Sequence, residues 1–145
     1  MSEPSDFRDF IAALDARGVE FVIVGAFSLA YHGRPRATGD IDVWVRPTPE
    51  NAKRLLSALT DFGFGSLGLT ESDILSGKVI QLGYPPVRID LMTDLDGVTA
   101  EEVWAERVAG KFGDKPANYM SKRCLILNKK ATGRPQDLAD IDALG

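Results

Sequence analysis

The feature that most restricts the fold of this chain is a strictly alternating segment at residues 40–45 (DIDVWV). Successive side chains of a β-strand point to opposite faces, so two aspartates and a tryptophan share one face while three apolar β-branched residues share the other. A short β-branched run of this kind is typical of a strand. The pattern predicts a sheet with one apolar face against helices and two neighbouring carboxylates, Asp40 and Asp42, on the opposite face.

Helices are predicted from apolar residues at helical spacing and from capping residues. They begin near residues 7, 26, 48, 99, 121 and 135. Thr99 and Glu102 form a capping-box pattern, and Ser121 is placed to cap the helix that follows it. In the last predicted helix three apolar residues are expected to face inward: Leu138, Ile141 and Leu144.

Further strands are predicted from short apolar runs bounded by turn residues. They cover residues 20–24, 78–82 and 87–92. The glycine-rich residues 62–77 are predicted as a loop with one helical turn at 71–75, and the basic stretch before Ser121 as a loop. The order of elements indicates an α/β (α+β) fold in which helices flank one mixed β-sheet.

Length and composition restrict the class of protein. A chain of 145 residues suits one domain, here taken as residues 1–145. No apolar run approaches the roughly 20 residues of a membrane span. The N-terminus has no apolar secretory core, and the single cysteine, Cys124, fits a reducing compartment. We expect a soluble, cytoplasmic protein without a membrane partner.

The formal net charge of −4 conceals an uneven distribution. Residues 107–134 contain eight basic residues and one acidic residue, so the rest of the chain is strongly acidic. A basic segment of this kind could bind a polyphosphate, a nucleic acid or an acidic partner. An ordinary solvated surface explains it equally well.

A third carboxylate, Asp90, lies on the predicted strand at residues 87–92, with apolar neighbours on the other face. If this strand pairs with the one at 40–45, Asp40, Asp42 and Asp90 converge. Like charges at short range repel unless a cation lies between them, and hard oxygen ligands suit Mg²⁺ or Mn²⁺. The alternative is an exposed sheet face on which the aspartates only contact solvent.

A strand that ends in Gly25 and continues directly into a helix precedes these carboxylates. Backbone N–H groups at such a helix start can bind phosphate, and glycine lets the backbone approach closely. Ser28 could add a hydroxyl, and Arg36 and Thr38 offer further donors before Asp40. A plain strand-to-helix turn is the alternative interpretation of Gly25.

These motifs together resemble the nucleotidyltransferase superfamily, which has the polymerase β-like fold. The matching segments are the strand–Gly25–helix unit, RATGDIDV at residues 36–43 and RIDL at residues 88–91. More closely, VGAFSLAYHGRPRATGDIDVWV and the tail KKATGRPQDLADIDAL resemble minimal bacterial nucleotidyltransferases related to abortive-infection toxins. The resemblance covers most of the chain, from about residue 21 to residue 144.

The resemblance implies roles for individual residues. Asp40, Asp42 and Asp90 would be the catalytic and metal-binding carboxylates, with Mg²⁺ or Mn²⁺ as the cofactor. The positions implied in nucleotide binding are Gly25, Ala26, Ser28, Arg36, Thr38, Lys130 and Arg134. Ala26 departs from the glycine or serine usual in the family. The alanine retains the backbone N–H but lacks the side-chain donor that a serine would offer.

The implied activity is metal-dependent transfer of an NMP group from an NTP such as ATP to a hydroxyl acceptor. The acceptor could be a small molecule such as an antibiotic, a protein or a tRNA, and the setting a toxin–antitoxin or defence system. A homodimer or partner protein could complete the acceptor site. Two alternatives stay open: an inactive module that binds nucleotide or protein, and a nuclease that uses the same carboxylates.

Other candidate residues have structural interpretations. His32 precedes Gly33 and is predicted as a helix cap. Trp44 could stack on a base or pack below the site. Asp137 and Asp140 share a helical face and could pair with basic residues or serve the site. Cys124 is predicted as a buried small apolar residue.

Overall fold

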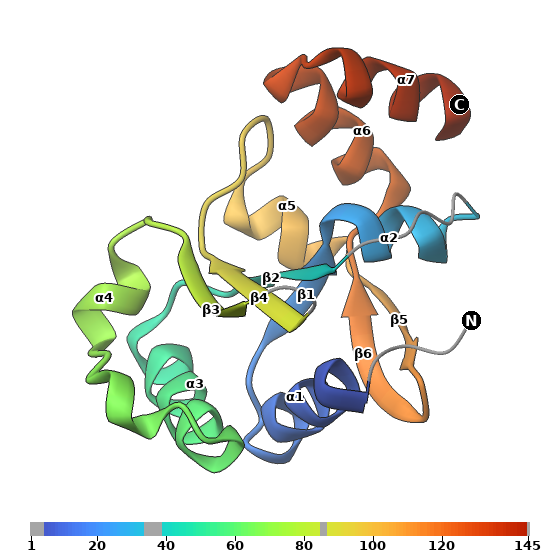
Figure 1. The fold of residues 1–145 in the computed structure, drawn as a ribbon. Coiled ribbons are helices and arrows are strands. Elements are labelled where there is room, and N and C mark those ends of the chain that lie inside the picture. Colours follow the sequence, from blue (N-terminus) through green and yellow to red (C-terminus); the bar gives the residue numbers. More distant parts are fainter. Residues whose placement is uncertain (1–4, 34–38, 85–86, 145) are drawn as a thin grey trace.

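The computed structural model describes residues 5–33, 39–84 and 87–144. Within these ranges six strands form one mixed sheet in the order β3-β4-β2-β1-β6-β5 (Figure 1). The strands are β1 (Phe21–Val24), β2 (Asp40–Val45), β3 (Ile80–Tyr84), β4 (Val87–Met92), β5 (Val108–Phe112) and β6 (Lys115–Tyr119). The helices are α1 (Ser5–Ala16), α2 (Gly25–Tyr31), α3 (Pro49–Phe62), the 3-10 turn η1 (Gly65–Leu67), α4 (Glu71–Leu75), α5 (Ala100–Ala105), α6 (Lys122–Thr132) and α7 (Pro135–Leu144).

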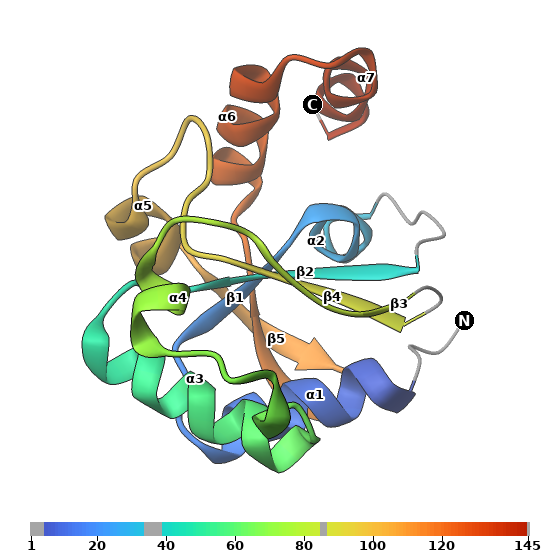
Figure 2. The same cartoon turned by 60° about the vertical axis from the view of Figure 1, so that its left-hand side comes forward.

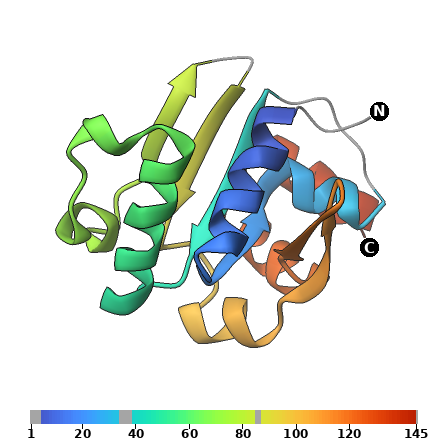
Figure 3. The ribbon, with the colours of Figure 1, turned by 90° about the horizontal axis from the view of Figure 1, so that it is seen from below.

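Helices cover both faces of the sheet. One face packs against α1 and α3, which lie below the strands in Figure 2 and in front of them in Figure 3. The other face packs against α2, α5 and α6. The alternation of β2 divides its side chains between these two layers, because Ile41, Val43 and Val45 join the first core and Trp44 joins the second. The predicted fold class and the predicted faces of β2 are therefore confirmed.

Local sequence signals set several element boundaries as expected. Thr48 caps α3, and its hydroxyl accepts from the backbone N–H of Asn51. Thr99 and Glu102 form both hydrogen bonds of a capping box at α5. Ser121 caps α6. The turn expected at 71–75 is α4, also opened by a capping box.

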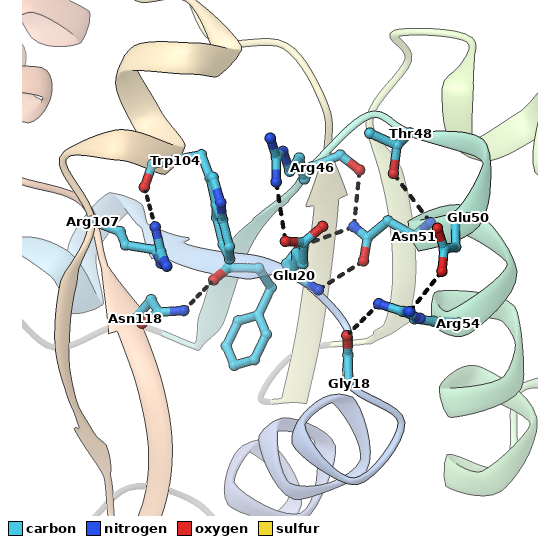
Figure 4. A network of polar contacts seen from close by, with 11 residues as sticks. Gly18, Glu20, Arg46, Thr48, Glu50, Asn51, Arg54, Trp104, Arg107 and Asn118 are labelled. Atoms are coloured by element: carbon cyan, nitrogen blue, oxygen red, sulfur yellow. Dashed lines mark hydrogen bonds and ion pairs between the residues drawn. The ribbon is translucent and has the colours of Figure 1, made fainter.

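A buried amide fixes α3 to the end of the sheet away from the carboxylates (Figure 4). Asn51 Oδ1 accepts from the Glu20 backbone N–H at 2.7 Å, and Asn51 Nδ2 donates to the carbonyl oxygens of Glu20 and Arg46, each at 2.9 Å. In the same region the Arg107 guanidinium lies 3.7 Å from the ring centroid of Trp104. The hydrogen bonds of Asn51 to Glu20 and Arg46 use both the oxygen and the nitrogen of its side-chain amide.

The loop predicted before Ser121 is wrong, because β5 and β6 form a hairpin there. Phe112 pairs with Lys115 across a two-residue turn in which Gly113 has a φ of 62°. The lysines and Pro116 interrupt the apolar pattern from which a strand is predicted. Pro116 is tolerated because β6 meets β1 only near Tyr119, so its missing N–H leaves no gap in that ladder.

The inward face predicted for α7 is wrong in part. Leu138 is 52% exposed, whereas Asp137 and Asp140 are buried. Both carboxylates face Lys129 of α6, whose Nζ lies 3.0 Å from Asp140 Oδ2 and 3.6 Å from Asp137 Oδ1. At this point α7 therefore contacts a buried ammonium group of α6 and not an apolar side chain. No helix in the described ranges is long and apolar enough to cross a bilayer.

We predict that Lys129→Met destabilises the protein by about 3 kcal/mol, because it removes the ammonium that two buried carboxylates contact. Lys130→Met is the matched control: Lys130 is the exposed next residue of the same helix, and its loss should cost less than about 0.5 kcal/mol. Urea unfolding at pH 7 measures both. Equal effects of the two substitutions would show that the buried ion pair does not hold α7.

Candidate active site

The parallel pairing of β2 with β4 brings together the three carboxylates selected from the sequence. In the register of this pair Asp42 lies opposite Asp90, and Asp40 lies opposite Arg88. All four side chains occupy the same face, since each strand alternates with a period of two. Asp90 is only 7% exposed. The two strands are neighbours, as the predicted convergence of Asp40, Asp42 and Asp90 requires.

Arg88 links two of these carboxylates. Its Nη2 donates to Asp40 Oδ2 at 3.0 Å and to Asp90 Oδ2 at 3.1 Å. One guanidinium nitrogen therefore neutralises an aspartate on each strand. The sequence shows Arg88 only as part of the RIDL motif, without a role of its own, although its position two residues before Asp90 places it on the same face.

The third carboxylate, Asp42, has the raised pKa of the cluster. Burial raises its pKa to about 6, and the negative charges of Asp90 and then Asp40 add to the increase. Arg88 opposes the shift without cancelling it. A carboxylate held in this state is a favourable place for a cation, because a positive charge would relieve both the burial and the repulsion.

Gly25 lies directly against Asp42. It has a φ of +67°, and a Cβ built on it would lie 2.2 Å from Asp42 Oδ2. A side chain at this position would therefore be strained by the backbone and would collide with the carboxylate. Glycine lets the start of α2 approach the carboxylate cluster, with Ala26 half-buried as the next residue.

Ser28 requires a correction. Its side chain is fully buried, and its hydroxyl donates to the Met120 carbonyl oxygen at 3.3 Å. It therefore ties α2 to the end of β6 and does not present a hydroxyl to a triphosphate in this structure. His32 is the C-cap of α2, as predicted, through its backbone N–H, and its Nε2 lies 2.8 Å from the same Met120 carbonyl oxygen.

The remaining predicted nucleotide contacts stay predictions. Arg36 and Thr38 lie outside the described residues. Lys130 is exposed on α6, and Arg134 donates from Nε to Asp137 Oδ2 at 2.8 Å. Hydrogen bonds from Arg134 and Thr132 hold the pKa of Asp137 well below its usual range. These contacts give the C-terminal motif a clear structural role in joining α6 to α7.

Two further expectations about single residues are settled by burial. Trp44 is buried, and its Nε1–H donates to the Thr93 carbonyl oxygen at 3.1 Å, so it packs below the site and is not available to a base. Cys124 is buried in the second core, where burial raises the pKa of its thiol.

Part of the basic segment is paired with acidic side chains. Arg123 pairs with Glu102 and Glu106, and Lys129 with the two buried aspartates of α7. Arg107 stacks on Trp104. Arg123 and Lys129 are thus engaged within the fold, whereas Lys111, Lys122 and Lys130 are exposed, and a binding role for the exposed cations stays a prediction.

The donor chemistry of the cluster fits a divalent cation, but its present arrangement is closed. Asp90 Oδ1 is buried and has no hydrogen-bond partner among the described residues, so it is open to a donor or a cation. Over the same residues, however, no group of three or more His, Cys, Asp or Glu side chains is gathered as a metal site requires. Arg88 bonds to two of the three carboxylates instead.

Comparison with known proteins identifies the fold. No family model matches the chain, and no curated protein matches its sequence. Among solved structures, the antibiotic-resistance factor ANT(2'')-Ia in solution superposes with a TM-score of 0.61 at 15% identity, over 97% of this chain and 80% of that one.

Two further structures agree. ANT(2'')-Ia in complex with adenylyl-2''-tobramycin gives a TM-score of 0.59 at 15% identity, over 97% of this chain and 86% of that one. A candidate nucleotidyltransferase from Thermotoga maritima gives 0.58 at 16% identity, over 99% and 92% of the two chains. The fold is therefore that of the nucleotidyltransferases, a mixed sheet flanked by helices.

We predict that Gly25→Ala destabilises the protein by about 2 kcal/mol or more, because it adds a collision with Asp42 to the cost of a left-handed backbone. Gly18→Ala is the matched control, since Gly18 has a φ of +68° with nothing within 4 Å of its added Cβ. It should cost only about 1 kcal/mol. Urea unfolding measures both variants, and the excess cost of Gly25→Ala should shrink in an Asp42→Ala background. An unchanged excess would show that Asp42 does not set the requirement for glycine.

We predict that Asp42→Asn stabilises the protein at pH 7.5 by about 1–3 kcal/mol. With a raised pKa, folded Asp42 keeps its proton to about pH 6, whereas the unfolded chain loses it near pH 4. Stability therefore falls as the pH rises through this window, and the asparagine variant avoids the loss. Unfolding curves at pH 4 and pH 7.5 should differ from wild type only at the higher pH. The exposed Asp94→Asn variant should match wild type at both.

Proposed function

We propose that this protein is a metal-dependent nucleotidyltransferase that transfers an NMP group from an NTP to a hydroxyl acceptor. The observation that carries the proposal is the register that sets Asp42 opposite Asp90 on one face, with Asp40 beside them and Gly25 against Asp42. The fold shared with nucleotidyltransferases supports it. A cluster with a raised Asp42 pKa is costly to maintain, which is typical of a functional site.

The proposed chemistry is an in-line displacement at phosphorus. A bond forms between the acceptor oxygen and the α-phosphorus, the bond to the pyrophosphate oxygen breaks, and the acceptor hydroxyl loses its proton. Such a reaction needs positioning and charge neutralisation and no protein nucleophile. Bound Mg²⁺ or Mn²⁺ would neutralise triphosphate charge and lower the pKa of the acceptor hydroxyl.

The protein's own residues divide these tasks. Asp40, Asp42 and Asp90 would hold the cation. Asp90, whose Oδ1 has no hydrogen-bond partner among the described residues, is the best placed to receive the acceptor proton. Gly25 lets the backbone at the start of α2 lie against Asp42, and that backbone would contact the triphosphate beside the carboxylates.

The acceptor is proposed at the level of a hydroxyl-bearing class: a small molecule, a protein side chain or a tRNA end. The solved ANT(2'')-Ia complex contains adenylyl-2''-tobramycin, so an aminoglycoside belongs in the first set of acceptors tested. A toxin–antitoxin setting, which the sequence resemblance suggests, would add a partner protein or a second copy of the chain to complete the acceptor site.

Transfer of label tests the proposal. Each of the four α-³²P NTPs is incubated with Mg²⁺ or Mn²⁺ and with an aminoglycoside mixture, a protein lysate or a tRNA pool. Wild type should label one acceptor class, whereas Asp42→Asn should reduce the rate at least about 100-fold, because it removes a carboxylate that would hold the cation. Asp94→Asn, an exposed acid just beyond β4, serves as the control and should retain wild-type activity.

Calorimetry with NTP and Mg²⁺ separates the remaining outcomes. Metal-dependent NTP binding without label transfer would overturn the enzymatic proposal in favour of a nucleotide-binding module. Degradation of nucleic acid without NTP would indicate a nuclease. Absence of NTP binding, or equal binding by wild type and Asp42→Asn, would remove both the metal and the nucleotide roles.

A further inference from the structure

The hydrogen bonds of Arg88 are incomplete within the described residues. Its Nη2 bonds to Asp40 and Asp90, yet its Nε is buried without a hydrogen-bond partner among the described residues. Within the part of the chain that the structure describes, the only other buried side-chain nitrogen or oxygen in this state is Oδ1 of Asp90, the residue that Arg88 contacts. A buried donor or acceptor without a partner costs about 1–3 kcal/mol, so two within one ion pair require a reason.

The two unsatisfied atoms have opposite needs. Nε–H of Arg88 lacks an acceptor, and Oδ1 of Asp90 lacks a donor or a cation. An anion and a cation arriving together would satisfy both, whereas either one alone would leave the other atom unsatisfied. A triphosphate with its divalent ion is a ligand of this composition, and guanidinium groups bind phosphate oxygens well.

Resting on the function proposed above, we propose that Arg88 is the resident counter-ion of the site. It occupies the place of a divalent cation between Asp40 and Asp90 until a nucleotide attracts its guanidinium. Cation binding is therefore weak in the absence of nucleotide and strong in its presence. Arg88 is in this sense a positioning residue, because it couples the binding of two ligands.

A purely structural role makes the opposite prediction. If Arg88 only fastened β4 to β2, its loss would disorder the carboxylates and weaken every ligand. If it competes with the cation, its loss must strengthen cation binding, since one positive charge that contacts Asp40 and Asp90 is then removed. A gain of affinity is therefore the diagnostic result.

The experiment measures Mn²⁺ binding to the full chain from the electron paramagnetic resonance signal of free Mn²⁺. Arg88→Gln should bind Mn²⁺ on the order of tenfold more tightly than wild type without nucleotide. A non-reacting NTP analogue should raise the Mn²⁺ affinity of wild type by a similar factor and that of Arg88→Gln much less. Calorimetry should show weaker binding of the analogue by Arg88→Gln in the absence of metal.

Arg46→Gln is the matched control. Arg46 also forms a part-buried ion pair, 3.1 Å from Glu20, and its side chain is 41% exposed against 31% for Arg88. It lies at the other end of β2, so its loss should leave Mn²⁺ affinity unchanged. Arg88→Lys, which keeps a positive charge, should bind Mn²⁺ within about threefold of wild type.

If the glutamine variant does not fold, the wild type still provides a test. In protein labelled with ¹⁵N-arginine, the Arg88 Nε–H signal should shift when the NTP analogue is added and stay in place with Mn²⁺-free buffer alone. Unchanged or weaker Mn²⁺ binding by Arg88→Gln, or an Nε–H signal insensitive to nucleotide, would overturn the counter-ion role. Metal-dependent NTP binding by wild type in that case would leave the proposed function intact, whereas its absence would reject both.

Discussion

The parallel register between β2 and β4 is the constraint on which the rest of the structure depends. It places Asp42 opposite Asp90 and Asp40 opposite Arg88 on one face of the sheet, so four charged side chains share a patch that is partly closed to water. Burial, with added repulsion from Asp90 and Asp40, raises the pKa of Asp42 to about 6. A slip of one residue would send these side chains into the apolar core, which fixes the register.

Residues around this patch reduce its steric and electrostatic cost. Gly25 removes a side chain that would collide with Asp42, and Arg88 supplies one positive charge to two carboxylates. The opposite face of β2 is buried against α1 and α3, and Asn51 anchors α3 at the far end of the sheet. Stability is thus concentrated away from the carboxylates, an arrangement that permits a costly cluster to persist.

The C-terminal helices follow a different electrostatic logic. Their basic residues look in the sequence like part of a surface for polyanions, yet acids from α5 and α7 contact Arg123, Lys129 and Arg134. Lys129 is buried between α6 and α7, while Lys130, its neighbour, is exposed. The net charge of a segment therefore indicates which ligands it could attract. The fold decides whether its charged side chains pair instead with residues of the same chain.

The sequence by itself determined the features that depend on local rules: the two faces of β2, the capped starts of α3, α5 and α6, and the choice of the three aspartates. Those follow from strand alternation, capping chemistry and charge, which act over a few residues. Only the tertiary structure decided what depends on distant partners. It made strands of the segments around Pro116, and it turned Leu138 outward because Lys129 holds the aspartates of α7. The fold also buried Ser28, whose hydroxyl donates to the Met120 carbonyl oxygen. It also placed Arg88 between two carboxylates, because strand order and register are set by the packing of the whole sheet.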